Sequence, residues 1–348
     1  TAHLVEAQNR KSHRSLGHYR IQAAVILILA ALICTGGGTA YYLYRAVHVP
    51  VPAESNNFLV TSGSSLPDFT RTLKKQGIVT TEWPLQVWAL ISGAAGSLKA
   101  GEYRFETGDT AAKILSKVVR GEGVQRKFTI LEGWTFRDLR DALGKKKALK
   151  QITRDLNDNE ILDQLGIRKS HPEGLFFPDT YFFVHGHTDL DLLRRSALKM
   201  STELQAAWIE RAYGLPYDNP YAALIMASIV EKEALLDVEK PVISGVLCNR
   251  LRQGMRLQAD PTVIYGLGSG FDGDLKRRHL RQDSPYNTYK RKGLPPTPIA
   301  LPGAAALAAA VNPANTKAIY FVARGDGSHQ FSTTLQEHNA AVRTYQLK

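Results

Sequence analysis

Two glutamates separated by one residue end an otherwise apolar stretch, and they are the strongest candidates for chemistry in this chain. Glu231 and Glu233 follow residues 219–230, where a helix would be apolar or small on every face beyond its first turn. A helix that is hydrophobic all round is usually buried. Burial penalises the charged form of a carboxyl group and raises its pKa. A glutamate at this position could therefore stay protonated near neutral pH and act as a general acid.

The two glutamates are expected to have different roles. At about 100° per residue, they lie on nearly opposite faces of the helix. Glu231 shares its face with Ala227 and Ser228, which are small enough to leave room for a ligand, whereas Glu233 shares its face with bulky residues such as Met226. This pattern predicts that Glu231 is the catalytic acid and that Glu233 packs. The alternative is that the helix ends before both residues and that both carboxylates are solvated.

The sequence predicts neither a metal site nor a cofactor. It contains no Gly-rich phosphate loop, no HExxH helix and no Cys/His metal spacing. Cys34 and Cys248 are the only cysteines, and Cys34 lies in an apolar segment that is expected to be in a membrane, so no disulfide framework exists.

Residues 21–44 form an uncharged run long enough to cross a bilayer. Basic residues precede it, which by the positive-inside rule places residues 1–20 in the cytoplasm and residues 45–348 outside. We therefore expect a single-pass anchor in the inner membrane and a periplasmic catalytic domain. The alternative is a cleaved signal peptide. The net charge of +12 suits anionic lipid head groups and acidic wall polymers, and the anchor argues against a nucleic-acid partner.

We expect an α+β fold outside the membrane segment. Residues 45–57 contain two prolines and should form a linker, followed by a small α+β region at 58–150 and a catalytic domain at 151–348. Short β-rich runs in the first region lead repeatedly through a Gly-x-Ser/Thr turn into a helical pattern, which is typical of small α+β modules. The residues expected to cap these helices are Ser65, Thr110 and Thr135.

Together these segments resemble the endolytic murein transglycosylase (YceG-like) family of bacteria. The resemblance extends from the apolar segment to near the C-terminus and rests on several motifs in the same order. These motifs are ASIVEKE at 227–233, RL at 250–251, LQADPTVIYG at 257–266, SPYNTY at 284–289, GLPP at 293–296 and HQF at 329–331.

The resemblance implies a function and a site. It implies cleavage of nascent peptidoglycan glycan strands beside the synthases of the inner membrane, which would limit strand length, and a LysM-like subdomain within 58–150. It also implies that Glu231, the first glutamate of the E-K-E motif, is catalytic. The candidates for holding the sugar and stabilising its positive charge are Gln258, Asp260, Ser284, Tyr286, Asn287 and Tyr289. The residues with an expected supporting role are Glu233, Arg250 and His329.

The implied reaction needs a single carboxyl group. A lytic transglycosylase protonates the glycosidic oxygen that leaves C1 of N-acetylmuramic acid (MurNAc), and the C6 hydroxyl of the same sugar then attacks C1. The product is a 1,6-anhydro end formed without water, and one glutamate can act first as acid and then as base. One alternative is a muramidase-type hydrolase with a second acid, for which Asp260 is the candidate. Another is a membrane-anchored scaffold that binds peptidoglycan.

Overall fold

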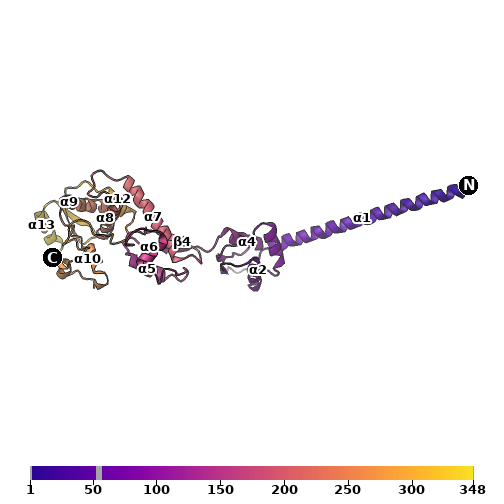
Figure 1. The fold of residues 1–348 in the computed structure, drawn as a ribbon, viewed down its shortest axis with the longest axis horizontal. Helices are drawn as coiled ribbons and strands as arrows, with labels where there is room; N and C mark the ends of the chain where they lie inside the picture. Colours follow the sequence, from indigo (N-terminus) through magenta and orange to yellow (C-terminus); the bar gives the residue numbers. More distant parts are fainter. Residues whose placement is uncertain (1, 52–56, 348) are drawn as a thin grey trace. The chain divides into compact units, whose positions relative to one another are not determined.

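The structure, a computed structural model, describes residues 2–51 and 57–347, with side chains described from residue 22 onward. Its elements are shown in Figure 1. The chain divides into two compact units, Thr1–Val124 and Gln125–Lys348. The mixed helical and β architecture expected from the sequence is confirmed. The expected boundary between residues 150 and 151 falls inside the second unit, so the functional division at that point stays a prediction.

The first unit begins with a long helix, α1 (Ala2–His48). Its segment Gln22–His48 has a mean hydropathy of 2.1 and is, in the part of the chain that the structure describes, the one helix long and apolar enough to cross a membrane. Length and composition alone do not distinguish an anchor from an N-terminal signal sequence. The helix continues past residue 44, where the apolar run was expected to end.

The end of α1 packs on the unit that follows it. Val47 and Val51 are buried in the same apolar cluster as Phe58, and the N–H of Val51 donates to the carbonyl of Asp109 at 2.8 Å. Residues 45–51 therefore do not form the linker expected from the prolines. The remainder of that expected linker, up to residue 56, lies outside the described residues.

The rest of the first unit is a two-stranded antiparallel sheet with helices packed on it. Phe58 pairs with Tyr103 across the sheet, and both side chains are buried in the core. The elements are β1 (Asn57–Val60), α2 (Leu66–Lys75), α3 (Trp83–Ile91), β2 (Gly101–Arg104) and α4 (Ala111–Arg120). Two helices thus lie between the paired strands in the chain.

The second unit opens with the same order of elements. Strand β3 (Arg126–Thr129) pairs antiparallel with β4 (Thr180–Phe183), and α5 (Phe136–Gly144) and α6 (Asp158–Leu165) come between them. The predicted caps are confirmed in both units, because the side chains of Ser65, Thr110 and Thr135 each accept a bond from a backbone N–H in the first turn of their helices.

The remainder of the second unit surrounds helix α8 (Pro220–Glu233). Figure 1 shows α8 among α7, α9 and α12, and each of these helices packs against it. Asn219 caps α8 by accepting from the N–H of Ala222 at 2.9 Å, and residues 223–230 are buried. The surrounding elements are α7 (Asp189–Ile209), the 3₁₀ helix η1 (Asp237–Glu239), α9 (Lys240–Arg252), α10 (Asp260–Leu267), the 3₁₀ helix η2 (Gly268–Gly270), α11 (Arg277–Arg281), α12 (Ala304–Val311), β5 (Tyr320–Ala323), β6 (His329–Ser332) and α13 (Leu335–Tyr345).

Candidate functional site

The carboxylate of Glu231 is occupied by protein partners on both oxygens. Lys240 donates from Nζ to Oε1 at 3.0 Å, and the backbone N–H of Gly303 donates to Oε2 at 2.9 Å. The side chains of Glu231 and Lys240 are 7% and 3% exposed, and Lys240 also pairs with Asp237 at 2.8 Å. A buried ion pair needs such additional hydrogen bonds to offset its desolvation. Glu231 thus joins the end of α8 to the starts of α9 and α12.

Glu132, on the loop after β3, lies beside this ion pair. A Cβ built on Gly303 would lie 1.7 Å from Oε1 of Glu132, so a larger residue there would displace the Glu132 side chain. Burial, and then the nearby charge of Glu231, raise the pKa of Glu132. On the same loop the carbonyl of Gly133 accepts a bond from Lys232 Nζ at 3.1 Å. These contacts indicate that the surroundings of Glu231 hold segments together.

Glu233 has the environment of a general acid. It makes no hydrogen bond or ion pair with any residue that the structure describes, and it is partly exposed. Burial raises its pKa to about 8; the charge of Asp260 adds to this effect and that of Arg250 opposes it. A carboxyl group with this pKa carries its proton at neutral pH and can donate it.

The geometry therefore favours Glu233, and not Glu231, as the proton donor. The expectation for Glu231 rested on the family resemblance and on its small neighbours along α8, which seemed to leave room for a ligand. That room is filled by Lys240 and by the backbone at Gly303. The bulky neighbours of Glu233 supply the desolvation that keeps its proton in place.

Arg250, the expected charge partner of Glu233, is engaged elsewhere. Its Nε donates to the carbonyl of Ile319 and its Nη1 to that of Leu257, both at 2.6 Å, and its guanidinium lies over the ring of Tyr320. Arg250 is buried. Its charge acts on Glu233 from a distance, while its hydrogen bonds hold the segment that leads to α10 against β5.

Asp260 and Tyr289 form a hydrogen-bonded pair close enough to Glu233 for their charges to matter. The Tyr289 hydroxyl donates to Oδ1 of Asp260 at 2.5 Å. The charges of Asp260 and Glu233 contribute to the raised pKa of Tyr289, although burial is the largest cause. Thus two of the predicted substrate-binding residues lie beside the candidate acid.

Gln258 has the one non-glycine backbone with positive φ, +50°, in the part of the chain that the structure describes. Its side chain is exposed, and its N–H donates to the carbonyl of Thr288 at 3.2 Å. A residue other than glycine in this region is strained, and such strain gathers at functional sites. The conformation supports the predicted role of Gln258 near the sugar.

Asn287 is predicted to bind substrate, but the structure gives it an architectural role. It is 1% exposed, and its Oδ1 accepts from the N–H of Tyr289 at 2.9 Å. Its Nδ2 donates to backbone carbonyls that end α11 and follow it, those of His279, Leu280 and Gln282. Asn287 therefore shapes the loop that presents Tyr289 and has no free polar group for a sugar.

Ser284 and Tyr286 lie near Tyr265 and Gly266, toward the C-terminal end of α10. The Tyr286 hydroxyl shares a hydrogen bond with Thr297 Oγ1 at 2.8 Å, and its ring meets that of Tyr265 with the centroids 4.9 Å apart. Ser284 Oγ accepts from the N–H of Tyr286 at 3.3 Å. Tyr286 lines the cavity between α5 and α10, whereas Ser284 supports the turn that carries Tyr286.

His329, predicted to be supporting, is held by Glu239. Its Nδ1 lies 2.7 Å from Glu239 Oε2, and the backbone N–H of His329 also donates to that carboxylate at 3.0 Å. The imidazole meets Phe321 edge to face. His329 therefore ties β6 to η1, consistent with the predicted role.

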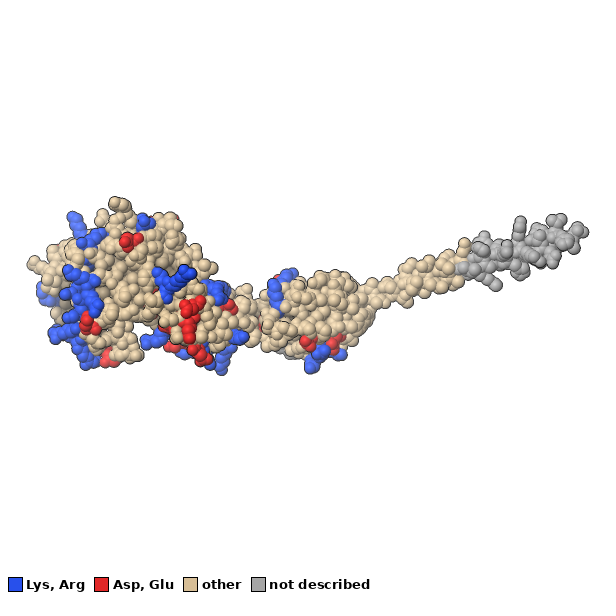
Figure 2. Space-filling model, viewed as in Figure 1, with Lys and Arg blue, Asp and Glu red and all other residues tan. Residues whose placement is uncertain are grey.

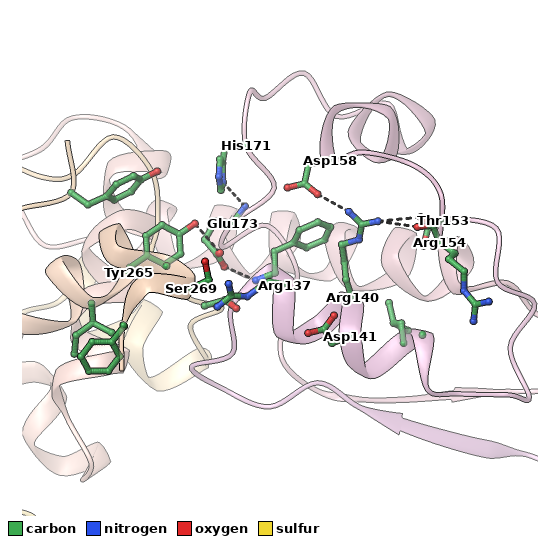
Figure 3. A pocket seen from close by; sticks show the side chains of 18 of the residues that line it. Arg137, Arg140, Asp141, Thr153, Arg154, Asp158, His171, Glu173, Tyr265 and Ser269 are labelled. Carbon is green, nitrogen blue, oxygen red and sulfur yellow. Dashed lines mark hydrogen bonds and ion pairs between the residues drawn. The ribbon is translucent and has the colours of Figure 1, made fainter. Parts of the chain in front are cut away.

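A cavity of about 910 Å³ lies between α5 and α10. Figure 3 shows Glu173, Arg137, Tyr265 and Ser269 at one side, with Arg140, Asp158 and Arg154 at the other. Glu173 is 2% exposed. It accepts from the N–H of Phe136 at 2.9 Å and from the Tyr265 hydroxyl at 3.0 Å. Burial raises its pKa to about 7, against the lowering effect of these hydrogen bonds.

The sequence analysis did not single out Glu173, Glu132 or Lys240. A signal existed for Glu173, which stands in an otherwise aromatic and proline-rich stretch, HPEGLFFPDTYFF at 171–183. No local pattern marks Glu132 or Lys240, because their importance comes from tertiary contacts with Glu231 made by other elements.

The fold and site define a class of protein: a mixed helix-and-sheet chain with an apolar N-terminal helix and a carboxyl group of raised pKa at the end of a buried helix. The sequence model of the YceG-like family matches residues 58–344. The chain belongs to the YceG-like family, and the resemblance inferred from the motifs is confirmed.

Relatives and a solved structure agree with this assignment. The endolytic murein transglycosylase of Bacillus subtilis is 32% identical over 331 residues, which cover 88% of this chain and 90% of that protein. The endolytic murein transglycosylase of Streptococcus pneumoniae is 25% identical over 362 residues, 93% of this chain and 65% of that longer protein. A crystal structure of a yceG-like protein from Listeria monocytogenes matches with a TM-score of 0.52 and 28% identity, covering 82% of this chain and 99% of that one.

Proposed function

We propose that this protein is a lytic transglycosylase that cleaves the bond between MurNAc and N-acetylglucosamine (GlcNAc) inside peptidoglycan strands and leaves 1,6-anhydro ends. Membership of a family with endolytic murein transglycosylases supports the enzyme class and the substrate. The observation that carries the site assignment is Glu233, a partly exposed carboxyl without a partner among the described residues, whose pKa is about 8. The reaction requires one group that donates a proton and then takes one back.

In the proposed mechanism Glu233 gives its proton to the glycosidic oxygen as the bond from that oxygen to C1 of MurNAc breaks. The released GlcNAc end gains a hydroxyl group, and C1 develops oxocarbenium-like charge. The Glu233 carboxylate then takes the proton of the C6 hydroxyl while O6 bonds to C1. The enzyme returns to its protonated state and no water is consumed.

The neighbours of Glu233 can stabilise the charges that develop in the two steps of this mechanism. The pair of Asp260 and Tyr289 places a negative charge close to the developing cation, which stabilises it. The charge of Arg250 stabilises the Glu233 carboxylate after proton transfer without being bonded to it. Gln258 is exposed on the same segment and is available to the sugar.

The setting of this reaction is also proposed. An anchor at residues 21–44 would keep the enzyme at the inner membrane with the catalytic domain in the periplasm, next to peptidoglycan synthases, where its cuts would limit strand length. Figure 2 shows Lys and Arg side chains gathered over much of the second unit, with fewer Asp and Glu. Such a surface favours encounter with acidic wall polymers.

We also propose a LysM-like role for one of two similar modules. Each module has two helices inserted between the strands of an antiparallel pair, in the order β1-α2-α3-β2 in one and β3-α5-α6-β4 in the other. The Gly-x-Thr turn expected of such a module lies directly before α5. We propose that the module β3-α5-α6-β4 contributes to binding the glycan.

Mass spectrometry of the products tests the proposed reaction. The purified full-length chain is incubated with uncrosslinked glycan strands, and the new ends are weighed. We expect anhydro ends, each lighter by one water than a reducing end. Reducing ends would instead identify a hydrolase, for which Asp260 beside Glu233 is the second carboxyl. Binding without any cleavage would favour a scaffold.

A further inference from the structure

We propose that the cavity between α5 and α10 holds the muramyl substituent of the glycan strand, with Arg137 binding a carboxylate of that substituent. This inference rests on the proposed function, because it names a part of the substrate. The shared chemistry is a carboxylate, and it can come either from the lactyl group of MurNAc or from the peptide attached to it.

The cavity has the size and the walls of a ligand site. Its volume of about 910 Å³ lies in the usual range for small-ligand pockets. Tyr265 and Tyr286 offer partly exposed aromatic rings to it, and such rings can pack against the apolar faces of sugars. Glu173 joins the opposite walls through its hydrogen bonds to Phe136 of α5 and Tyr265 of α10, so the site is preorganised.

The position of the cavity relative to the candidate acid follows from α10. Asp260, at the first residue of this helix, acts on Glu233 through its charge, and Tyr265 further along the same helix lines the cavity. With a rise of about 1.5 Å per residue, these two positions are roughly 7.5 Å apart along the helix axis. A strand cleaved at Glu233 would therefore have a neighbouring substituent within reach of the cavity.

The charges lining the cavity leave a cation available. Arg140 is committed, because it donates to Asp158 at 2.9 Å and to the carbonyl of Leu156 at 2.7 Å. Arg137 makes no hydrogen bond or ion pair with any residue that the structure describes. Figure 3 shows Arg137 on the same side of the cavity as Glu173, whose pKa burial raises to about 7.

Two further charged groups complete the lining. Arg154 adds a second cation whose guanidinium makes no hydrogen bond or ion pair with a residue that the structure describes, and the carboxylate of Asp141 is exposed. The uncommitted charged groups are thus two arginines and Asp141, beside Glu173, whose carboxyl group is engaged by Phe136 and Tyr265. This balance favours an anionic guest, and the planar guanidinium of arginine matches a carboxylate.

Binding of three matched ligands tests the proposal. The full-length chain carrying Glu233→Gln is titrated with strands that keep their peptides, with strands from which the peptides have been removed so that lactyl carboxylates remain, and with a chitooligosaccharide of equal length that has no carboxylate. Adding Arg137→Ala to this chain should lower its affinity for the peptide-bearing strands, or for both muramyl ligands, by roughly tenfold or more. This is the usual effect of losing a charge-assisted hydrogen bond. Binding of the chitooligosaccharide should be unchanged.

The pattern of loss identifies the source of the carboxylate. Loss with both muramyl ligands indicates the lactyl group, and loss with the peptide-bearing strands alone indicates the peptide. Arg343→Ala, which removes an exposed arginine of α13 outside the cavity, is the control and should change none of the affinities. Arg137→Lys, which keeps the charge without the planar fork, should restore part of the affinity.

The proposal is overturned if Arg137→Ala leaves all three affinities unchanged. It is also overturned if the affinity for the chitooligosaccharide falls as much as the affinity for the muramyl ligands. Absence of muramyl-ligand binding by the Glu233→Gln chain would overturn it as well. Failure of the proposed function is distinguishable, because it appears as a lack of anhydro ends with the wild-type chain. A selective binding loss in Arg137→Ala would still support the cavity in that case.

Discussion

Glu233→Gln keeps the size of the side chain and most of its hydrogen-bonding capacity but removes the transferable proton. General acid–base catalysis contributes about 10²–10⁴-fold to a rate, and this residue is proposed to serve as both acid and base. We therefore expect turnover on uncrosslinked strands to fall about 10³-fold or more, with the melting temperature unchanged or higher because a desolvated ionisable group has been removed. Release of anhydro ends and a thermal melt measure both effects.

Glu231→Gln is the matched variant and should show the opposite pattern. It removes one partner of a buried ion pair and leaves Lys240 with Asp237 alone. The expected loss is about 3 kcal/mol of unfolding free energy, the low end for such a change because one partner remains. Turnover per folded molecule should stay within about tenfold of wild type. A stable but inactive Glu231→Gln protein would identify Glu231, and not Glu233, as the general acid.

The pKa of Glu233 also predicts the pH dependence of the enzyme. The protonated form is the active one, so kcat/KM should fall tenfold per pH unit above about pH 8, where the free enzyme loses this proton. Stability should follow the same group. Because the folded pKa is raised above the ordinary value of 4.5, the native state binds more protons than the unfolded state between these values, and stability is lost as the pH rises through this window.

The Gln variant provides the control for this linkage. It lacks the titrating group, so its stability advantage over wild type should grow between pH 4.5 and about 8 and then level off. Thermal melts across this range measure the difference. An advantage independent of pH, or an activity limb well below pH 7, would contradict the assigned pKa.

At the scale of the element, the close contact of α9 with the loop after α12 predicts that a larger residue at Gly245 destabilises the fold. A Cβ at Gly245 would lie 2.5 Å from the backbone carbonyl oxygen of Ala314 and 2.9 Å from the Thr316 side chain. Because a backbone oxygen cannot turn aside, Gly245→Ala should force the two segments apart. We expect a loss of about 1–3 kcal/mol, as for other overpacked cores, measured by denaturant unfolding.

Gly144→Ala is the control for that substitution. Gly144 is the last residue of α5, and a Cβ there would meet nothing within 4 Å. Alanine has the better helix propensity, so this change should be neutral or should stabilise by up to about 1 kcal/mol. Equal effects from the two substitutions would mean that the Gly245 contact is not tight.

Helices and their ends could be predicted from the sequence because their determinants are local. Asn219 with Pro220, and the hydroxyls of Ser65, Thr110 and Thr135, mark helix starts by their own chemistry. The apolar character of α8 likewise indicated a buried helix with two acids at its end. The motifs were sufficient to recognise the family, and the matching family model confirmed it.

The roles of the two glutamates could not be predicted in this way. Neighbours along one helix show which side chains lie on a face, but not what other elements bring to that face. Lys240 is brought to Glu231 by the turn through η1, and the Gly303 N–H comes from a residue 72 positions further along the chain. For Asn287 the sequence did not show that the loop around the end of α11 would bring three carbonyls to its side-chain amide.

At the scale of the whole molecule, the apolar N-terminal segment and the first unit share one continuous helix. Helix α1 includes the candidate membrane span and ends at His48, and Val47 near its end is 1% exposed within the core of that unit. Sequence reasoning placed a linker here because of its prolines. It could not anticipate that the last turn of the helix is also a core element.

This shared helix predicts how the chain can be truncated. A chain that starts at residue 41 keeps Val47 and Val51, both in the core of the first unit, and should remain folded without the apolar segment. A chain that starts at residue 57 loses both valines. Burial of each contributes about 1.5–3 kcal/mol, so the first unit should lose about 3–6 kcal/mol and melt early. Melts of the two truncated chains, with the second unit as internal reference, measure the difference, and identical transitions for the first unit would show that residues 45–51 are a linker after all.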